Sequence, residues 1–294
     1  MCLYVTIAVC VVDCALVVYS EMKSRVPTLT HVILSQVRSG VSAVTSLGDD
    51  VFVVHEYSQQ IEVYDAETFT LYSLITIPGL GYCAFGLAVC AVNHCIYASD
   101  LDNNSIHRVE LSGSNAVKTW FVARGPRGLS VNKAHNLAVS CREANKLQEY
   151  TTDGFLIREI YLQAGITRPW HAIQLSTGHY VVSQWTLPGV VSVVGVDGQV
   201  IHSYGQSQTS VVGQMIHPSS LAVTKNDDIL VADINNYRIL SIIRSTGCVQ
   251  ELALSVDDRI QIPSGLCLDE SRGRLYVGEY GRPHRVFVFD GVSL

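Results

Sequence analysis

The sequence lacks the short motifs of the common enzyme classes. It contains no Gly-x-Ser-x-Gly elbow, no His-Glu-x-x-His pair and no Gly-x-x-x-x-Gly-Lys phosphate loop. It therefore gives no local sign of an α/β-hydrolase, a zinc peptidase or a P-loop nucleotide enzyme. The nine cysteines have irregular spacing and form no Cys-x-x-Cys pair, so they do not match a zinc site either. We expect no cofactor and no bound metal.

Charge is also scarce, and positive charge most of all. Only 16% of the 294 residues are charged, and the formal net charge is −6. Proteins that hold nucleic-acid phosphates over a broad face are usually basic. The balance therefore argues against DNA binding, although it leaves room for a local basic patch.

The sequence has no helical periodicity, and short apolar segments recur instead. A small residue followed by an apolar anchor appears six times, at Ala43-Val44, Gly86-Leu87, Gly128-Leu129, Ala172-Ile173, Ser220-Leu221 and Gly265-Leu266. The anchors are 42 to 48 residues apart. A period of about 40–50 residues with several short strands in each repeat is typical of a β-propeller.

Each repeat contains further strand-like segments after its anchor, and five of the six end with a fourth, outer strand. The sixth repeat reaches Leu294 without one, whereas Thr30–Val37 forms a strand-like segment that belongs to no repeat. Pairing these two ends removes an open sheet edge. The sequence thus predicts an all-β fold over residues 30–294. We expect a six-bladed β-propeller with four-stranded antiparallel blades, closed by an N-terminal strand that completes the last blade.

Two stretches resemble the NHL-repeat family, namely HPSSLAVTKNDDILVADINNYRILSI at 217–242 and GPRGLSVNKAHNLAVSCREANKLQEY at 125–150. The family pattern places a proline before the anchor, an acidic residue after the second strand, then asparagine and a cation. Pro218, Asp233, Asn236 and Arg238 match it in the fifth repeat. The first and fourth repeats are degenerate. We expect Asp233, Asn236 and Arg238 to be structural, because a short carboxylate can hold the turn that follows it.

The resemblance implies a binding function. NHL propellers are often the substrate-recognition part of tripartite-motif ubiquitin ligases, and some of them bind RNA. This chain has no RING-type Cys/His array, B-box or heptad coiled coil. We expect a non-catalytic scaffold for a protein partner, with RNA as the alternative. A metal-dependent, lactonase-like hydrolase is a third hypothesis. It fits less well, because the inner strands are mostly apolar and an acid appears in them only at Asp269.

Candidate partner-binding residues lie in loops that a propeller brings to one face. Basic and aromatic side chains gather in the loops around the third, fourth and fifth inner strands: Arg124, Arg127, Arg142, Arg168, Trp170, His171, Trp185 and His217. Arginine and tryptophan are frequent in binding hot spots, and they also stack on single-stranded RNA. The alternative is structural, with the tryptophans sealing blade contacts and the arginines paired with Glu143 or Glu149.

The first 29 residues form a separate apolar segment. Residues 3–20 have the composition of a signal or anchor, but Asp13 lies near their middle, and a central aspartate costs about 2.5–3.5 kcal/mol on insertion. A strand or domain edge fits the same residues. The unpaired cysteine pattern favours a cytoplasmic protein. Secretion, or a membrane anchor at residues 3–20, is the alternative.

Overall fold

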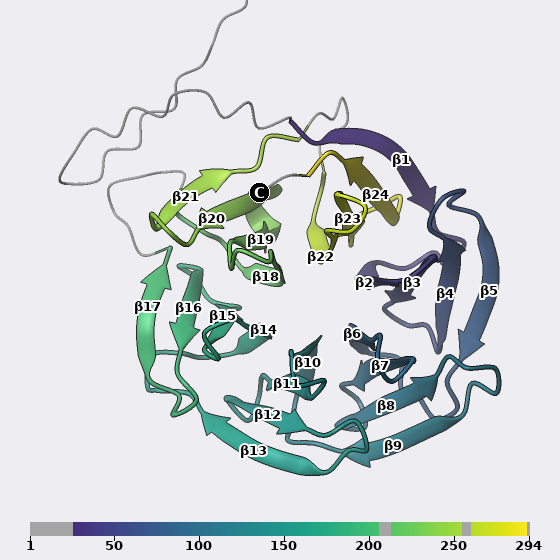
Figure 1. The fold of residues 1–294 in the computed structure, drawn as a ribbon, viewed down its shortest axis with the longest axis horizontal. Coiled ribbons are helices and arrows are strands. Elements are labelled where there is room, and N and C mark those ends of the chain that lie inside the picture. The colour runs from purple at the N-terminus through teal and green to yellow at the C-terminus, as the bar shows by residue number, and fades with distance from the viewer. Residues whose placement is uncertain (1–25, 206–212, 255–259, 293–294) are drawn as a thin grey trace, which may run out of the picture.

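The computed structural model describes residues 26–205, 213–254 and 260–292. These residues form six four-stranded antiparallel sheets arranged radially around one axis (Figure 1). The prediction of an all-β, six-bladed propeller is therefore confirmed. The apolar segment at residues 3–20 lies outside the described residues. Within the described part of the chain, no helix has the length and apolar character needed to cross a bilayer.

Each blade runs from an inner strand at the axis to an outer strand at the rim. Blades one to three are β2 (Val41–Leu47), β3 (Asp50–His55), β4 (Gln60–Asp65) and β5 (Leu71–Thr76); β6 (Ala84–Cys90), β7 (Cys95–Asp100), β8 (Ser105–Glu110) and β9 (Val117–Phe121); and β10 (Pro126–Val131), β11 (Leu137–Cys141), β12 (Lys146–Tyr150) and β13 (Leu156–Tyr161). Blades four and five are β14 (Pro169–Gln174), β15 (Tyr180–Gln184), β16 (Val190–Val194) and β17 (Val200–Tyr204); and β18 (Pro218–Val223), β19 (Ile229–Asp233), β20 (Arg238–Ile243) and β21 (Cys248–Glu251). A short helix, η1 (Ile234–Asn236), joins β19 to β20.

The ring closes in blade six as predicted. This blade contains β22 (Pro263–Asp269), β23 (Arg274–Glu279) and β24 (Arg285–Asp290), and β1 (Thr28–Leu34) completes it as the outer strand. The β1–β24 pairing runs from Thr28 opposite Asp290 to Leu34 opposite Arg285. The strand ends at Leu34 rather than at Val37. Beyond it the chain turns toward blade one, where the Glu62 carboxylate accepts hydrogen bonds from the Ser35 hydroxyl and the Gln36 N–H.

The hydrophobic core is divided among the interfaces between neighbouring blades. The described residues form six apolar clusters, and each cluster joins two adjacent blades; Phe52 of blade one and Ile96 of blade two belong to the same cluster, for example. Alternate side chains on the strands bury against the next blade. Each fully buried aliphatic side chain contributes about 1.5–3 kcal/mol.

Glycine before the anchors of blades two and three allows neighbouring inner strands to meet closely at the axis. A methyl group on Gly86 would lie 2.2 Å from the carbonyl oxygen of Arg127, and one on Gly128 would lie 2.6 Å from that of Trp170. Glycine at these positions therefore lets the backbones of blades two, three and four approach one another closely. This contact brings the starts of their inner strands together.

The fourth blade differs from the sequence prediction by one residue. Leu129 lies opposite Val139, the third residue of β11, and Ala172 occupies the equivalent place opposite Val182 of β15. The anchor of this blade is thus Ala172 rather than Ile173. His171 then takes the position that is glycine in blades two and three.

The NHL-type residues of blade five hold a loop in place. The buried Asp233 carboxylate accepts hydrogen bonds from the Ile216 N–H (2.7 Å), the Asn236 amide (2.7 Å) and Arg238 Nε (3.0 Å). Ile216 belongs to the loop that leads into β18. These contacts agree with the structural role predicted for Asp233, Asn236 and Arg238.

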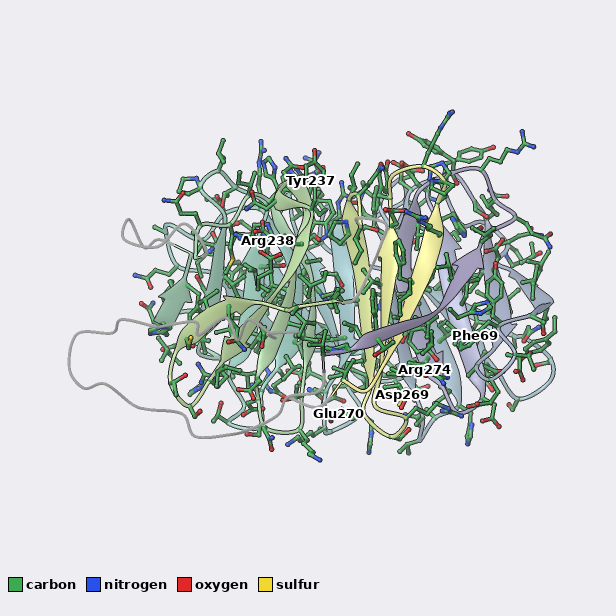
Figure 2. All side chains as sticks on the ribbon, turned by 90° about the horizontal axis from the view of Figure 1, so that it is seen from above. Phe69, Tyr237, Arg238, Asp269, Glu270 and Arg274 are labelled. Carbon is green, nitrogen blue, oxygen red and sulfur yellow. The ribbon has the colours of Figure 1, made fainter. Side chains whose placement is uncertain are left out.

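The two faces of the propeller carry different types of loop. Tyr237, in the turn after β19, lies at one face, and Glu270, in the turn after β22, lies at the other (Figure 2). Turns between the second and third strands of a blade share the Tyr237 face with the connections that lead into the inner strands. We call this face the loop face. All eight predicted binding residues lie in these turns and connections or within the first three residues of an inner strand.

Candidate functional site

A continuous stack of side chains crosses four blades on the loop face. The Arg127 guanidinium lies over two rings, 3.7 Å from the centroid of Phe85 and 4.3 Å from that of Trp170. Trp170 stacks on Trp185 at 4.3 Å, and Trp185 stacks on His217 at 4.6 Å. We call these five residues the aromatic–cation stack. The structure thus brings together four of the predicted residues: Arg127, Trp170, Trp185 and His217.

The propeller repeat explains why three members of the stack meet. Phe85, Arg127 and Trp170 each follow the first residue of an inner strand, in three consecutive blades. The other three blades have serine at the same position, namely Ser42, Ser219 and Ser264. Of these six residues, Phe85 and Trp170 line the cavity at the mouth of the axis together with Ser42 and Ser264.

The backbone adopts an unusual turn before the four inner strands that begin with proline; Ile262, before Pro263, has a φ of 71°. The residues before Pro126, Pro169 and Pro218 all have positive φ: Gly125 at 77°, Arg168 at 52° and His217 at 57°. Only glycine adopts this conformation without strain, so Arg168 and His217 are held in it by their surroundings. The Asn145 side chain accepts a hydrogen bond from the Arg168 N–H at 3.2 Å.

Arg127 is the most unusual member of the stack. Its side chain is only 8% exposed, and its Nε and Nη1 have no hydrogen-bond partner among the described residues. Burial, reinforced by the nearby Arg142 charge, lowers the pKa of Arg127 to about 10. Buried cations are normally paired. Here the two aromatic rings provide the main stabilising contacts.

The remaining arginines of the prediction lie beside the stack. Arg142 is 5.7 Å from the Trp170 ring centroid. Burial, followed by the charge of Arg168, lowers the pKa of Arg142. Arg124 points elsewhere and forms an exposed ion pair with Glu143 at 3.3 Å. The predicted alternative of pairing with Glu143 thus holds for Arg124, whereas Glu149 pairs with Arg158.

His171 has a different role from the stack residues. Its Nε2 lies 3.0 Å from the Leu129 carbonyl of blade three, and its Nδ1 accepts the Leu221 N–H of blade five at 3.0 Å. These contacts require a neutral ring with the proton on Nε2. Burial lowers the pKa of His171 to about 4, which keeps the ring neutral at pH 7. His171 therefore bridges three blades at the axis.

The sequence prediction did not include Phe85, because a lone phenylalanine before an anchor resembles ordinary core. The available signal was its repeat position, which Arg127 and Trp170 share.

The axis itself is narrow at the stack and wider beyond it. A cavity of about 40 Å³ lies among Ser42, Phe85, Trp170 and Ser264, and a hollow of about 280 Å³ opens at the other end between apolar strands. Sites for drug-sized molecules usually measure roughly 300–1,000 Å³. Among the described residues, no group of three or more His, Cys, Asp or Glu side chains is placed to hold a metal ion.

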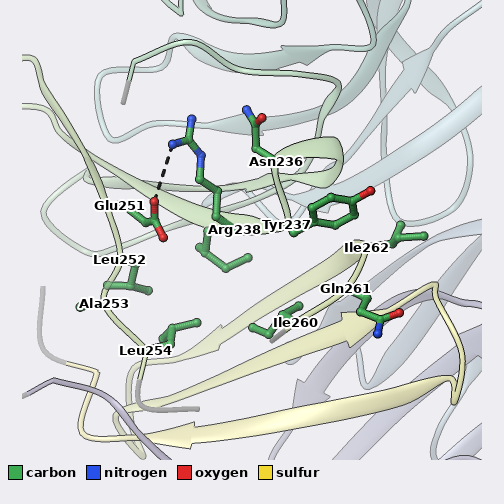
Figure 3. A pocket seen from close by; sticks show the side chains of 11 residues that line it. Asn236, Tyr237, Arg238, Glu251, Leu252, Ala253, Leu254, Ile260, Gln261 and Ile262 are labelled. Atoms are coloured by element: carbon green, nitrogen blue, oxygen red, sulfur yellow. Dashed lines mark ion pairs between the residues drawn. The ribbon is translucent and has the colours of Figure 1, made fainter. Parts of the chain in front are cut away.

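A larger hollow lies between blades five and six. It measures about 810 Å³ and is bounded by residues 236–239, 251–254 and 260–262 (Figure 3). The charged side chains in it are paired, since Arg238 lies 3.0 Å from Asp233 and 3.6 Å from Glu251. Residues 255–259, which separate two of these segments in the sequence, lie outside the described residues. The aromatic–cation stack therefore remains the better candidate.

Comparisons with known proteins identify the fold and no family. No family model matches the chain, and no curated protein matches it. Among solved structures, Kuenenia stuttgartiensis hydrazine synthase is 13% identical, with a TM-score of 0.65, 88% of this chain covered and 99% of that one. Virginiamycin B lyase from Staphylococcus aureus is also 13% identical, with a TM-score of 0.65 and coverages of 87% and 97%. The WD40 β-propeller domain of Doa1 is 14% identical, with a TM-score of 0.63 and coverages of 90% and 97%. At these identities the likeness concerns the fold alone, which both enzymes and other proteins use.

Proposed function

We propose that this chain is a non-catalytic binding propeller that recognises a partner protein through the aromatic–cation stack on its loop face. The observation that carries the proposal is the stack itself, in which four blades contribute side chains to one row. Tryptophan and arginine are the residues most enriched in binding hot spots. A purely structural row would not need a buried cation without an ion pair between two of its rings.

A protein partner fits the stack better than RNA does. Recognition of single-stranded RNA relies on bases stacking against free aromatic faces. Here Trp170 already has Arg127 and Trp185 as stacking neighbours, and Trp185 has Trp170 and His217. The indole edges remain for contacts with a partner. The net charge of −6 also disfavours a long phosphate backbone.

The hydrolase hypothesis has less support. The end of the axis at the stack holds a cavity of only about 40 Å³, enough for a few waters. The wider end is lined by apolar strand residues such as Val89, Val131 and Leu268. A hard metal ion requires several converging oxygen ligands.

The finer parts of the proposal follow from the resemblance. The Asp233, Asn236 and Arg238 arrangement supports membership of the NHL propellers, and with it a place as the substrate-recognition part of a ubiquitin-ligase system. A cytoplasmic location belongs to the same proposal.

Affinity capture from the native cell tests the proposal. We expect the wild-type chain to retain a set of proteins that survives nuclease treatment, and Trp185→Ala to lose it. Tyr237→Ala is the matched control, because Tyr237 lies on the same face, is 59% exposed and is absent from the stack. Capture that disappears with nuclease, or that Trp185→Ala leaves intact while the variant remains folded, would contradict the proposal.

A further inference from the structure

A basic hollow lies next to the aromatic–cation stack, between blades three and four. It measures about 440 Å³ and is lined by Arg142, Glu143, Asn145, Thr167 and Arg168. Arg142 and Glu143 belong to the turn after β11, whereas Thr167 and Arg168 lead into β14. Two loops distant in sequence thus form one concave surface. We call it the arginine hollow.

The arginine hollow carries more positive than negative charge, with two arginines and one glutamate in its lining. Neither Arg142 nor Arg168 has an ion pair within 4.0 Å among the described residues. The acidic wall residue, Glu143, pairs with Arg124 instead. The charge of Arg168 lowers the pKa of Arg142, and the charge of Arg142 lowers the pKa of Arg127. Glu143 attracts both Arg142 and Arg127 and so raises their pKa in part, but none of the three neighbouring arginines has a carboxylate within ion-pair distance among the described residues.

Arg127 makes this excess charge more significant. It lies 92% buried behind Trp170, and its Nε and Nη1 have no hydrogen-bond partner among the residues described. A buried charge acts through a medium of lower dielectric constant than water, so it attracts an anion more strongly than a surface charge does. A buried cation without an ion pair, beside the half-buried Arg142 and the exposed Arg168, is a favourable environment for an incoming negative group.

The backbone of the arginine hollow is fixed before any ligand arrives. Asn145 donates through its Nδ2 to the Ile166 carbonyl at 2.8 Å and accepts the Arg168 N–H at 3.2 Å. Gln184 accepts the Thr167 N–H at 3.1 Å. These contacts hold Arg168 in its left-handed conformation, at φ 52°. Preorganised cations lose less entropy on binding.

We propose that the arginine hollow binds a carboxylate side chain from an acidic segment of the partner protein. This inference rests on the proposed function and names the chemistry of its ligand. Arg142 and Arg168 contact the carboxylate, and Arg127 adds a buried positive charge behind them. The planar guanidinium matches a carboxylate in two parallel hydrogen bonds. The Glu143 carboxylate in the wall repels any anion, and it repels a phosphate dianion more strongly than a singly charged carboxylate.

A capped hexaglutamate peptide is the probe for this subsite, with binding measured by calorimetry at low ionic strength. We expect Arg142→Gln/Arg168→Gln to weaken binding at least about tenfold, which corresponds to about 1.4 kcal/mol. The matched control is Arg38→Gln/Arg282→Gln, which removes the same charge from exposed arginines in the same kinds of loop. The control should stay within about twofold of wild type. Arg142→Lys/Arg168→Lys should recover part of the affinity, which excludes simple unfolding.

The outcomes separate the possible ligands. Equal losses in the two glutamine variants would show attraction to overall charge and overturn the proposal. Binding of inorganic phosphate or of hexauridylate, with no binding of hexaglutamate, would overturn it in favour of a phosphate or an RNA. If hexaglutamate fails while Trp185→Ala still abolishes protein capture, the carboxylate subsite is wrong and the binding platform remains. If the wild-type chain also captures no protein, both the carboxylate subsite and the proposed function are wrong.

Discussion

Replacing Arg127 with methionine tests whether this buried cation serves binding rather than stability. Methionine fills a similar volume between Phe85 and Trp170 and makes favourable sulfur–ring contacts of about 0.3–1.5 kcal/mol. If the arginine were present for packing alone, its loss should destabilise the propeller. If it is present for a ligand, the fold should tolerate the change while binding is lost.

The expected change in stability follows from two opposing effects. The pKa of Arg127 falls from 12.5 to about 10, and at 1.36 kcal/mol for each pKa unit the buried charge costs the folded state about 3 kcal/mol. Its two ring contacts, at 3.7 and 4.3 Å, each return about 1–2 kcal/mol when desolvated. The two effects nearly cancel. We therefore expect the free energy of unfolding of Arg127→Met to lie within about 1 kcal/mol of wild type.

Urea unfolding at pH 7, followed by circular dichroism, measures this difference. Arg238→Met is the matched control, because Arg238 is paired with the fully buried Asp233 at 3.0 Å. Removing that partner leaves a buried carboxylate less satisfied, and we expect a loss of about 3 kcal/mol. A loss above about 2 kcal/mol in Arg127→Met, or binding of hexaglutamate equal to that of wild type, would refute the reasoning.

Three further predictions concern pH, strain and packing. Because the folded-state pKa of His171, about 4, lies below its ordinary value of 6.5, the unfolded chain binds more protons between these pH values, so stability falls as pH drops through this range. Between pH 7 and pH 5, the free energy of unfolding should fall by about 2 kcal/mol less in His171→Gln than in wild type, as measured by urea titrations. Equal slopes of unfolding free energy against pH would contradict the role of the neutral ring. Arg168→Gly should raise the free energy of unfolding by about 0.5–1 kcal/mol, because it relieves the left-handed strain at φ 52°. The same variant should bind hexaglutamate more weakly. Thermal melts measure the stability, and a clear loss of stability would contradict the prediction. Gly86→Ala should cost at least about 3 kcal/mol in urea unfolding, since the added methyl lies 2.2 Å from the Arg127 carbonyl oxygen; a stability equal to that of wild type would show that the two blades can separate.

The propeller was predictable from sequence because each repeat contains the same short local sequence pattern. The anchors at Leu87, Leu129, Leu221 and Leu266 each follow a small residue, and their spacing alone gives the number of blades. Ring closure followed from counting, since one outer strand was missing and one strand was left over. The fourth blade shows the limit, because the spacing did not reveal that His171 takes the glycine position.

The site was predictable only in part, because its contacts join residues about one repeat apart. Composition identified Arg127 and Trp170 as members of one basic and aromatic patch. It did not show that Phe85, 42 residues before Arg127, forms the other side of the same cation site. Nor did it show that the ring nitrogens of His171 are already bound to backbone groups of other blades. Such facts depend on the distance between neighbouring inner strands.

The pairing of β1 with β24 also affects how the chain is made. The Thr30 hydroxyl donates to the Val288 carbonyl, a partner 258 residues later. During synthesis the first strand of the sheet must therefore wait until nearly the whole sequence has emerged from the ribosome. Throughout that interval its unpaired backbone groups are open to other strands, including those of a neighbouring copy. We expect the pairing of β24 with β1 to control the yield of correctly folded protein in the cell.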